Sequence, residues 1–183
     1  YFSKRVTRAV PDGDPIEAHT DLVKKLDYEC ELAVVLGKDA RDVPAGQTRD
    51  YIFGYTILND VSARDVQTAH KQWYFGKSLD GFTPIGPCIV TADAFADYPP
   101  RLGIRSFVNG EKRQDSNTAL QIFDIDHVIA ELSQGMTLKA GTIIATGTPA
   151  GVGMGMDPPQ FLKPGDVVRC EIDGIGTLTN PVK

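Results

Sequence analysis

The amino-acid sequence predicts an α+β domain in which β-sheet dominates and the helices are few and short. Short apolar, β-branched and aromatic segments recur along the chain between turn residues, as in sheet proteins. The 18 glycines and 12 prolines are spread over all 183 residues, which argues against a helical bundle. Helical periodicity is confined to two short segments, so strands and helices do not alternate as in a parallel βαβ fold. We therefore expect one dominant sheet or a curled barrel.

Several segments have the composition of β-strands. These expected strands cover 28–37, 51–59, 88–91, 142–146, 167–172 and 175–179. Residues 102–113 alternate in polarity around Asn109-Gly110, the strongest hairpin signal in the chain. A second hairpin is expected at Asp173-Gly174.

Two segments predict helices. The first runs from 60 to about 70 and contains Ser62-Ala63-Arg64-Asp65, which fits a capping signature for a helix start. The second covers 124–133, where one stripe is apolar and Gly135 is the expected stop signal. That stripe consists of Ile125, Val128, Ile129 and Leu132. Residues 1–27, 38–50 and 71–87 are expected to be irregular.

Composition excludes several classes of function. The chain has 19 Lys and Arg against 24 Asp and Glu, a net charge of −5, and no basic stripe, which argues against a nucleic-acid or membrane-surface partner. No window approaches 18 apolar residues, so no transmembrane helix is expected. The three cysteines are widely spaced, which fits neither a disulfide framework nor a zinc site. We expect a single domain over 1–183 in the cytoplasm, with an organelle matrix as the alternative.

Three acidic residues form a candidate metal site. Glu29 and Glu31 lie two apart in an expected strand, so their side chains share a face and repel each other unless a cation or proton intervenes. Mg²⁺ favours carboxylate and water ligands. The alternative is an edge strand with a solvated acidic face. Asp60 follows the next apolar strand and is either a third ligand or a helix cap.

Other residues could bind an anionic substrate. Arg64 and Gln67 are three apart on one helix face, where Arg can pair with a carboxylate and Gln can orient a water or carbonyl. Lys77 lies among aromatic residues and could place a fixed charge beside an oxyanion. The loop 146–149 is small enough to bring backbone N–H groups and Thr hydroxyls to an anion. The alternatives are a solvated helix surface, an exposed lysine and a tight structural loop.

Five segments in order resemble the fumarylacetoacetate hydrolase family. They are 27–38 (DYECELAVVLGK), 54–67 (GYTILNDVSARDVQ), 76–80 (GKSLD) with 84–87 (PIGP), 108–111 (VNGE) and 144–153 (IATGTPAGVG). The resemblance covers nearly the whole chain from Tyr28 onward. It implies that 1–183 is a catalytic domain with a β-rich mixed-sheet roll, forming a homodimer with a Mg²⁺ or Mn²⁺ site.

The resemblance also assigns roles to individual residues. It implies that Glu29, Glu31 and Asp60 are metal ligands. It places Lys77 and Gln67 at catalytic positions and Arg64, Gly147 and Thr148 at substrate-binding positions.

The implied activity is carbon–carbon bond hydrolysis of an acylpyruvate or fumarylacetoacetate-like acid through a metal-stabilised enolate. The alternatives within the family are isomerisation of a dienoate diacid, tautomerisation, and decarboxylation of oxaloacetate. A non-catalytic, metal-organised binding module is the remaining alternative. The substrate is expected to be a small 2-oxo acid.

One element of the family pattern has no match here. Members of the family have an N-terminal segment whose His and Glu form an acid/base dyad. The resemblance begins only at Phe2-Ser3-Lys4, so we expect the dyad to precede Tyr1. The general base is therefore left unassigned.

Overall fold

The computed structural model describes residues 1–69 and 71–183, and two four-stranded antiparallel sheets form its centre. The strands are β1 (Leu26–Asp27), β2 (Cys30–Leu36), β3 (Ile52–Asn59), β4 (Ser62–Ala63), β5 (Ile85–Thr91), β6 (Gly103–Val108), β7 (Glu111–Asn117), β8 (Ile143–Ala145), β9 (Val167–Ile172) and β10 (Gly176–Pro181). The helices are α1 (Arg64–Ala69), α2 (Tyr74–Lys77) and α3 (Ile125–Leu132). This confirms the predicted sheet-rich α+β class.

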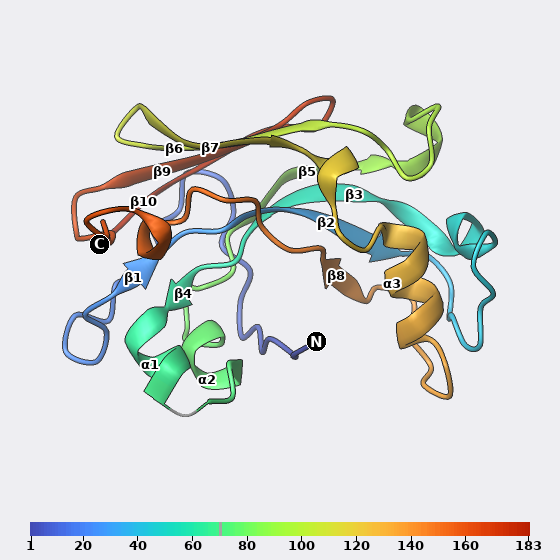
Figure 1. Cartoon of the computed structure of the whole chain (residues 1–183), viewed down its shortest axis with the longest axis horizontal. Coiled ribbons are helices and arrows are strands. Elements are labelled where there is room, and N and C mark those ends of the chain that lie inside the picture. Colours follow the sequence, from blue (N-terminus) through green and yellow to red (C-terminus); the bar gives the residue numbers. More distant parts are fainter. Residues whose placement is uncertain (70) are drawn as a thin grey trace.

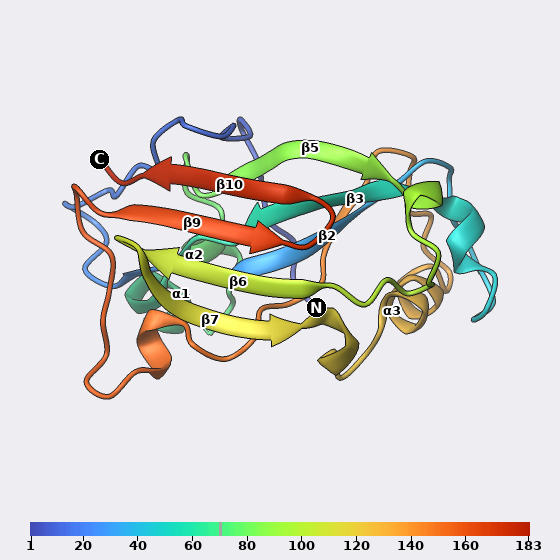
Figure 2. The same cartoon turned by 90° about the horizontal axis from the view of Figure 1, so that it is seen from above.

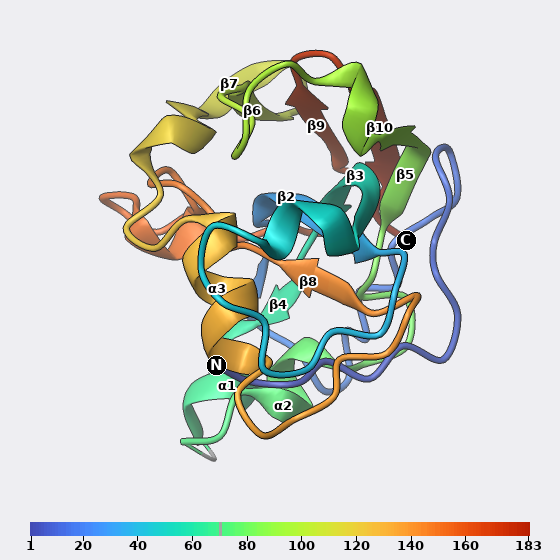
Figure 3. The same ribbon diagram turned by 90° about the vertical axis from the view of Figure 1, so that its right-hand side faces the viewer.

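The two sheets lie face to face (Figure 1). One has the strand order β10-β9-β6-β7 (Figure 2). The other has the order β5-β3-β2-β8. Seen end-on, the two layers curve into a roll (Figure 3). The roll implied by the family resemblance is thus confirmed. The expected dominant sheet or curled barrel was wrong, since eight strands divide equally between two sheets and β1 and β4 form a separate two-stranded sheet. The parallel part of the expected mixed sheet is limited to isolated bridges at Val10–Pro84 and Ile16–Val182.

Strand β2 lies at the centre of the molecule. All of its residues are buried, as expected for a strand covered on both faces. Cys30, Leu32 and Val34 belong to the main apolar core, which also includes residues of β9 such as Val168 and Cys170. Because side chains alternate along a strand, the glutamates that flank Cys30 face the opposite side. That side carries α1, α2 and the N-terminal segment (Figure 1).

Both predicted hairpins are confirmed. Asn109 and Gly110 join β6 to β7 with φ values of 52° and 83°, the left-handed conformation that an Asn-Gly turn supplies. Asp173-Gly174 lies between β9 and β10. The helix predicted over 124–133 is α3, capped by Asp124, whose side chain accepts a hydrogen bond from the His127 N–H.

The first predicted helix needs correction. It begins at Arg64 rather than near residue 60, because Ser62 and Ala63 form β4 and pair with β1. Ser62 is therefore not a helix cap, and its hydroxyl donates to the Asp60 carbonyl oxygen instead. Residue 70, the predicted end of this helix, lies outside the described residues.

Two further predictions differ from the structure. The segment 71–87 was expected to be irregular, yet it contains α2, which is too short at four residues to show a periodicity. The strand predicted over 88–91 begins earlier, at Ile85. None of the helices in the described ranges is long and apolar enough to span a membrane.

Gly54 of β3 is a position where the close approach of two strands requires glycine. A Cβ at Gly54 would lie 2.3 Å from the carbonyl oxygen of Val90 in β5. We expect Gly54→Ala to lower the free energy of unfolding by about 1–3 kcal/mol, because the strands must separate to admit the methyl group. Gly155→Ala is the control, since the atom nearest to its Cβ would be 3.8 Å away. Urea unfolding of both variants tests this, and an unchanged midpoint for Gly54→Ala would contradict it.

Candidate metal and substrate site

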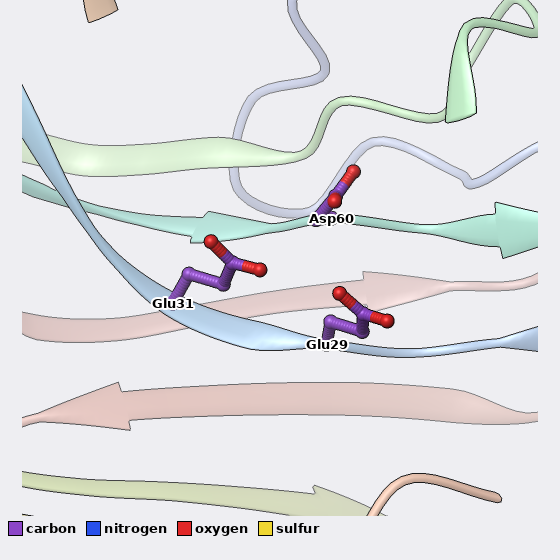
Figure 4. Close-up of side chains that lie close together, drawn as sticks. All are labelled: Glu29, Glu31 and Asp60. Atoms are coloured by element: carbon purple, nitrogen blue, oxygen red, sulfur yellow. The ribbon is translucent and has the colours of Figure 1, made fainter. Parts of the chain in front are cut away.

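Three buried carboxylates meet beside the N-terminal end of β2. Glu29, Glu31 and Asp60 each offer a carboxylate oxygen, and these oxygens all lie within 4.8 Å of one another. The side chains of Glu29 and Glu31 rise from the same face of the chain, and Asp60 lies next to them (Figure 4). None of the three residues is more than 9% exposed. The alternative of a solvated acidic face is therefore wrong.

The pairing of β2 with β3 brings these acids together. Cys30 is opposite Asn59 in the ladder, so Glu29 and Asp60 lie just beyond the two paired ends. The Asp60 N–H donates to the Glu29 carbonyl at 2.8 Å, and the Glu29 N–H donates to the Asn59 side chain at 2.9 Å. Glu29 thus precedes β2 rather than belonging to it, but its side chain points to the same side of the chain as that of Glu31.

Two lysines hold the two oxygens of Asp60. Lys77 Nζ lies 2.6 Å from Asp60 Oδ2 and 2.8 Å from Glu29 Oε2. Lys4 Nζ lies 2.6 Å from Asp60 Oδ1. The ammonium group of Lys77 is also 5.4 Å from the centroid of the Phe2 ring. Lys77 is 1% exposed, so the alternative of a surface lysine is wrong.

Arg64 holds the other oxygen of Glu29. Its Nη1 atom is 2.6 Å from Glu29 Oε1 and donates to Gln67 Oε1 at 3.2 Å. Its Nε atom donates to Asp27 Oδ2 at 2.9 Å. Its Nη2 atom is buried and has no hydrogen-bond partner within the described ranges. Arg64 and Gln67 therefore face the site rather than solvent.

Asp27 connects Arg64 to the glycine-rich loop. It is fully buried, and its carboxylate accepts hydrogen bonds from the backbone N–H groups of Gly153 at 2.7 Å and Met154 at 2.9 Å. A Cβ at Gly153 would lie 2.8 Å from Asp27 Oδ1, so this approach requires glycine. Asp27 thus positions Arg64 and anchors the loop at the same time.

The loop after β8 reaches the same cluster. The Gly147 N–H donates to Glu31 Oε2 at 2.7 Å, and the Thr148 hydroxyl donates to the Cys30 carbonyl at 2.9 Å. Both groups that were expected to face a substrate thus bind protein atoms here. A substrate-binding role for Gly147 and Thr148 stays a prediction.

The electrostatics of the cluster are nearly balanced. Asp27, Glu29, Glu31 and Asp60 supply four formal negative charges, and Lys4, Arg64 and Lys77 supply three positive ones. Burial, reinforced by Asp60 and Glu29, raises the pKa of Glu31 well above its usual value. Burial lowers the pKa of Lys4, although Asp60 opposes that shift.

These residues fit a hard divalent cation. The donor set consists of carboxylate oxygens, which Mg²⁺ and Mn²⁺ prefer. A cation among Glu29, Glu31 and Asp60 would also relieve the repulsion that adds to the effect of burial in raising the pKa of Glu31. The identity of the metal stays a prediction.

The structure brings together all eight residues predicted for the site. They are Glu29, Glu31, Asp60, Arg64, Gln67, Lys77, Gly147 and Thr148. Lys4, Asp27 and Gln114 also belong to the site, and we did not predict roles for them. The segments that resemble the family contain Lys4 and Asp27, but Gln114 lies in a polar stretch of β7 with no distinguishing pattern.

The fold and the site define a sheet-rich α+β domain of the fumarylacetoacetate hydrolase type with a buried carboxylate cluster. The family description "Fumarylacetoacetate (FAA) hydrolase C-terminal" matches residues 1–183. The chain belongs to this enzyme family.

Two named relatives illustrate the similarity. The chain is 47% identical over 181 residues to "Oxaloacetate tautomerase YisK" of Bacillus subtilis, covering 99% of this chain and 60% of that protein. It is 48% identical over 179 residues to an uncharacterized protein of Staphylococcus saprophyticus, covering 98% of this chain and 59% of that one. The chain therefore spans about 60% of the length of these relatives.

Solved structures agree with the fold. A fumarylacetoacetate hydrolase from the psychrophile Exiguobacterium antarcticum superposes with a TM-score of 0.92 and 52% identity, covering 94% of this chain and 62% of that chain. A 2-hydroxyhepta-2,4-diene-1,7-dioate isomerase from Mycobacterium marinum gives a TM-score of 0.83 and 43% identity, covering 94% and 64%.

We expect Asp27→Asn to lower the free energy of unfolding by about 1.5–3 kcal/mol, the usual contribution of a hydrogen bond to a charged group, because it removes one of the two carboxylates that pair with the buried Arg64. Asp173→Asn is the matched control, since its ion pair with Arg105 lies in solvent, which screens the charges. Chemical denaturation measures both variants. Equal losses of stability would show that Asp27 is not the anchor described here.

Proposed function

We propose that this chain provides the divalent-metal and substrate site of an enzyme that acts on a small 2-oxo dicarboxylate through its enolate. The observation that carries the proposal is the buried group of three carboxylates with oxygens within 4.8 Å of one another. Together with Asp27 they supply four formal negative charges in the interior, and Lys4, Arg64 and Lys77 offset three of them, so one is left. A resident cation would compensate for it.

Glu29, Glu31 and Asp60 would hold Mg²⁺ or Mn²⁺. When bound, the cation supplies Lewis acidity at a carbonyl oxygen of the substrate. Lys77 contacts two of the three carboxylates, so its ammonium group adds positive charge at the same place. The site thereby favours the negative charge that develops when a 2-oxo acid loses a proton beside its carbonyl group.

Arg64 is placed to bind the carboxylate of an anionic substrate. Its Nε and Nη1 atoms are held by Asp27, Glu29 and Gln67, which fixes the guanidinium plane. Its buried Nη2 atom has no partner within the described part of the chain, and a substrate carboxylate would satisfy it. Gln67 lies beside the Arg64 guanidinium group, and its side-chain amide is suited to orient a carbonyl group or a water molecule.

Keto–enol tautomerisation of an oxaloacetate-like acid is the first candidate reaction. The named relative from B. subtilis, which matches 99% of this chain, supports it. The reaction moves one proton between carbon and oxygen and breaks no carbon–carbon bond. Hydrolysis of an acylpyruvate or fumarylacetoacetate-like acid is the second candidate, favoured by the name of the E. antarcticum structure. Both reactions pass through the enolate of a 2-oxo acid, although the two enolates differ.

Metal binding is the first test. We expect Mn²⁺ to bind the protein in a calorimetric titration and Glu31→Gln to abolish detectable binding, since the amide keeps the shape but loses the charge. Glu111→Gln, an exposed position in β7, should bind Mn²⁺ as the unmodified protein does. Equal affinity of Glu31→Gln and the unmodified protein would remove Glu31 from the ligand set.

Turnover is the second test. With Mn²⁺, the protein should accelerate the interconversion of enol and keto oxaloacetate, followed by ultraviolet absorbance, and a chelator should stop it. We expect Arg64→Lys to raise KM at least tenfold, because an ammonium group cannot reach the position of Nη2. Cleavage of acylpyruvate without tautomerisation would select the second reaction. If neither reaction is accelerated, the enzyme proposal fails in favour of a binding module.

The homodimer expected from the family resemblance is also a proposal. Light scattering coupled to size-exclusion chromatography measures it directly.

A further inference from the structure

The edge of β2 that faces away from β3 is only partly covered by another strand. Strand β8 pairs with it at Ala33, Val34 and Val35 and then ends. Cys30 is the first residue of β2 and precedes Ala33 by three residues. It therefore has no strand partner on this side within the described ranges. Its N–H and carbonyl groups are buried and must be satisfied by other groups.

The side chain of Gln114 takes the place of the missing strand. Gln114 comes from β7 in the opposite sheet and is fully buried. Its Oε1 atom accepts from the Cys30 N–H at 3.1 Å. Its Nε2 atom donates to the Thr148 hydroxyl and to the Pro149 carbonyl, both at 2.8 Å. One carboxamide thus connects β2 to the loop that follows β8.

The Thr148 hydroxyl completes this connection. It donates its only proton to the Cys30 carbonyl at 2.9 Å and accepts from Gln114. Both ends of the connection thus meet at one hydroxyl group. Its immediate neighbour Gly147 donates its N–H to Glu31 Oε2 at 2.7 Å. The position of the loop thereby determines the position of the Glu31 carboxylate.

We propose that Gln114 is a positioning residue for the site: it fixes the loop 147–149 against Cys30, which holds Glu31 in place. Gln114 acts through Gly147 and Thr148 and touches no reacting atom. The link to catalysis rests on the proposed metal-binding function, whereas the link to the loop does not.

If Gln114 had only a structural role, its loss would lower stability without altering the site. Asn180 is a residue with such a structural role and serves as the comparison. Asn180 of β10 lies in the same sheet, is 1% exposed and also donates two hydrogen bonds, to the backbone carbonyls of Pro11 and Asp14 at 2.8 and 2.9 Å. Loss of either carboxamide leaves backbone groups without these hydrogen bonds and costs stability. Only the loss of Gln114 should alter the loop at Glu31.

The experiment compares Gln114→Leu with Asn180→Leu in the full chain. Amide hydrogen exchange, measured by NMR, reports the hydrogen bond between Gly147 and Glu31 without any metal. We expect exchange at Gly147 to accelerate at least tenfold in Gln114→Leu and to stay unchanged in Asn180→Leu. We also expect a loss of about 10–100-fold in Mn²⁺ affinity in Gln114→Leu alone, the usual effect of losing a group that orients a ligand.

Thr148→Val and Thr148→Ser test the same connection by a second route if Gln114→Leu does not fold. Valine removes the hydroxyl without changing the shape of the side chain, so it should accelerate exchange at Gly147, whereas serine should preserve slow exchange. Slow exchange at Gly147 in both Gln114→Leu and Thr148→Val would overturn the proposal. Failure of the unmodified protein to bind Mn²⁺ would overturn the proposed function but leave the exchange result to decide the role of Gln114.

Discussion

Mutual repulsion among buried carboxylates is the constraint on which the arrangement of this domain depends. Glu29, Glu31 and Asp60 place their oxygens within 4.8 Å of one another, where water cannot screen them. Each compensating cation comes from a different part of the chain: the N-terminal segment, α1 and α2 (Figure 1). These ion pairs therefore determine where the N-terminal segment and the two short helices lie. The same contacts stabilise the domain and build the candidate site.

Strand β2 separates two environments. One face packs Cys30 and Leu32 into the apolar core between the sheets, and the other carries the glutamates. This division lets a wholly buried strand contain acids without disrupting the core. The edge of β2 at Cys30, which has no strand partner in the described residues, lies between the apolar core and the carboxylate cluster. There the carboxamide of Gln114 accepts a hydrogen bond from the Cys30 N–H.

Local pattern was sufficient for much of the fold. Local pattern together with the family resemblance selected the eight predicted site residues that the structure brings together. Alternation placed Glu29 and Glu31 on one face, and turn chemistry located the Asn109-Gly110 and Asp173-Gly174 hairpins. Pattern failed where tertiary pairing overrode it, since pairing with β1 made Ser62 part of a strand instead of a cap. It also missed Lys4 and Gln114, because their roles depend on contacts across 56 and 84 residues of sequence that no local signal encodes.

The hydrogen bond between Gly147 and Glu31 joins residues that are 116 positions apart in the sequence, so the site cannot form completely while the chain is still short. During synthesis, the acids and their cations emerge long before the loop that completes them, because Lys77 precedes Gly147 by 70 residues. The cluster can reach its final form only after β8 has joined β2, so a finished site reports that the central sheet is complete. An ion that binds the finished site would stabilise the entire topology rather than one local segment.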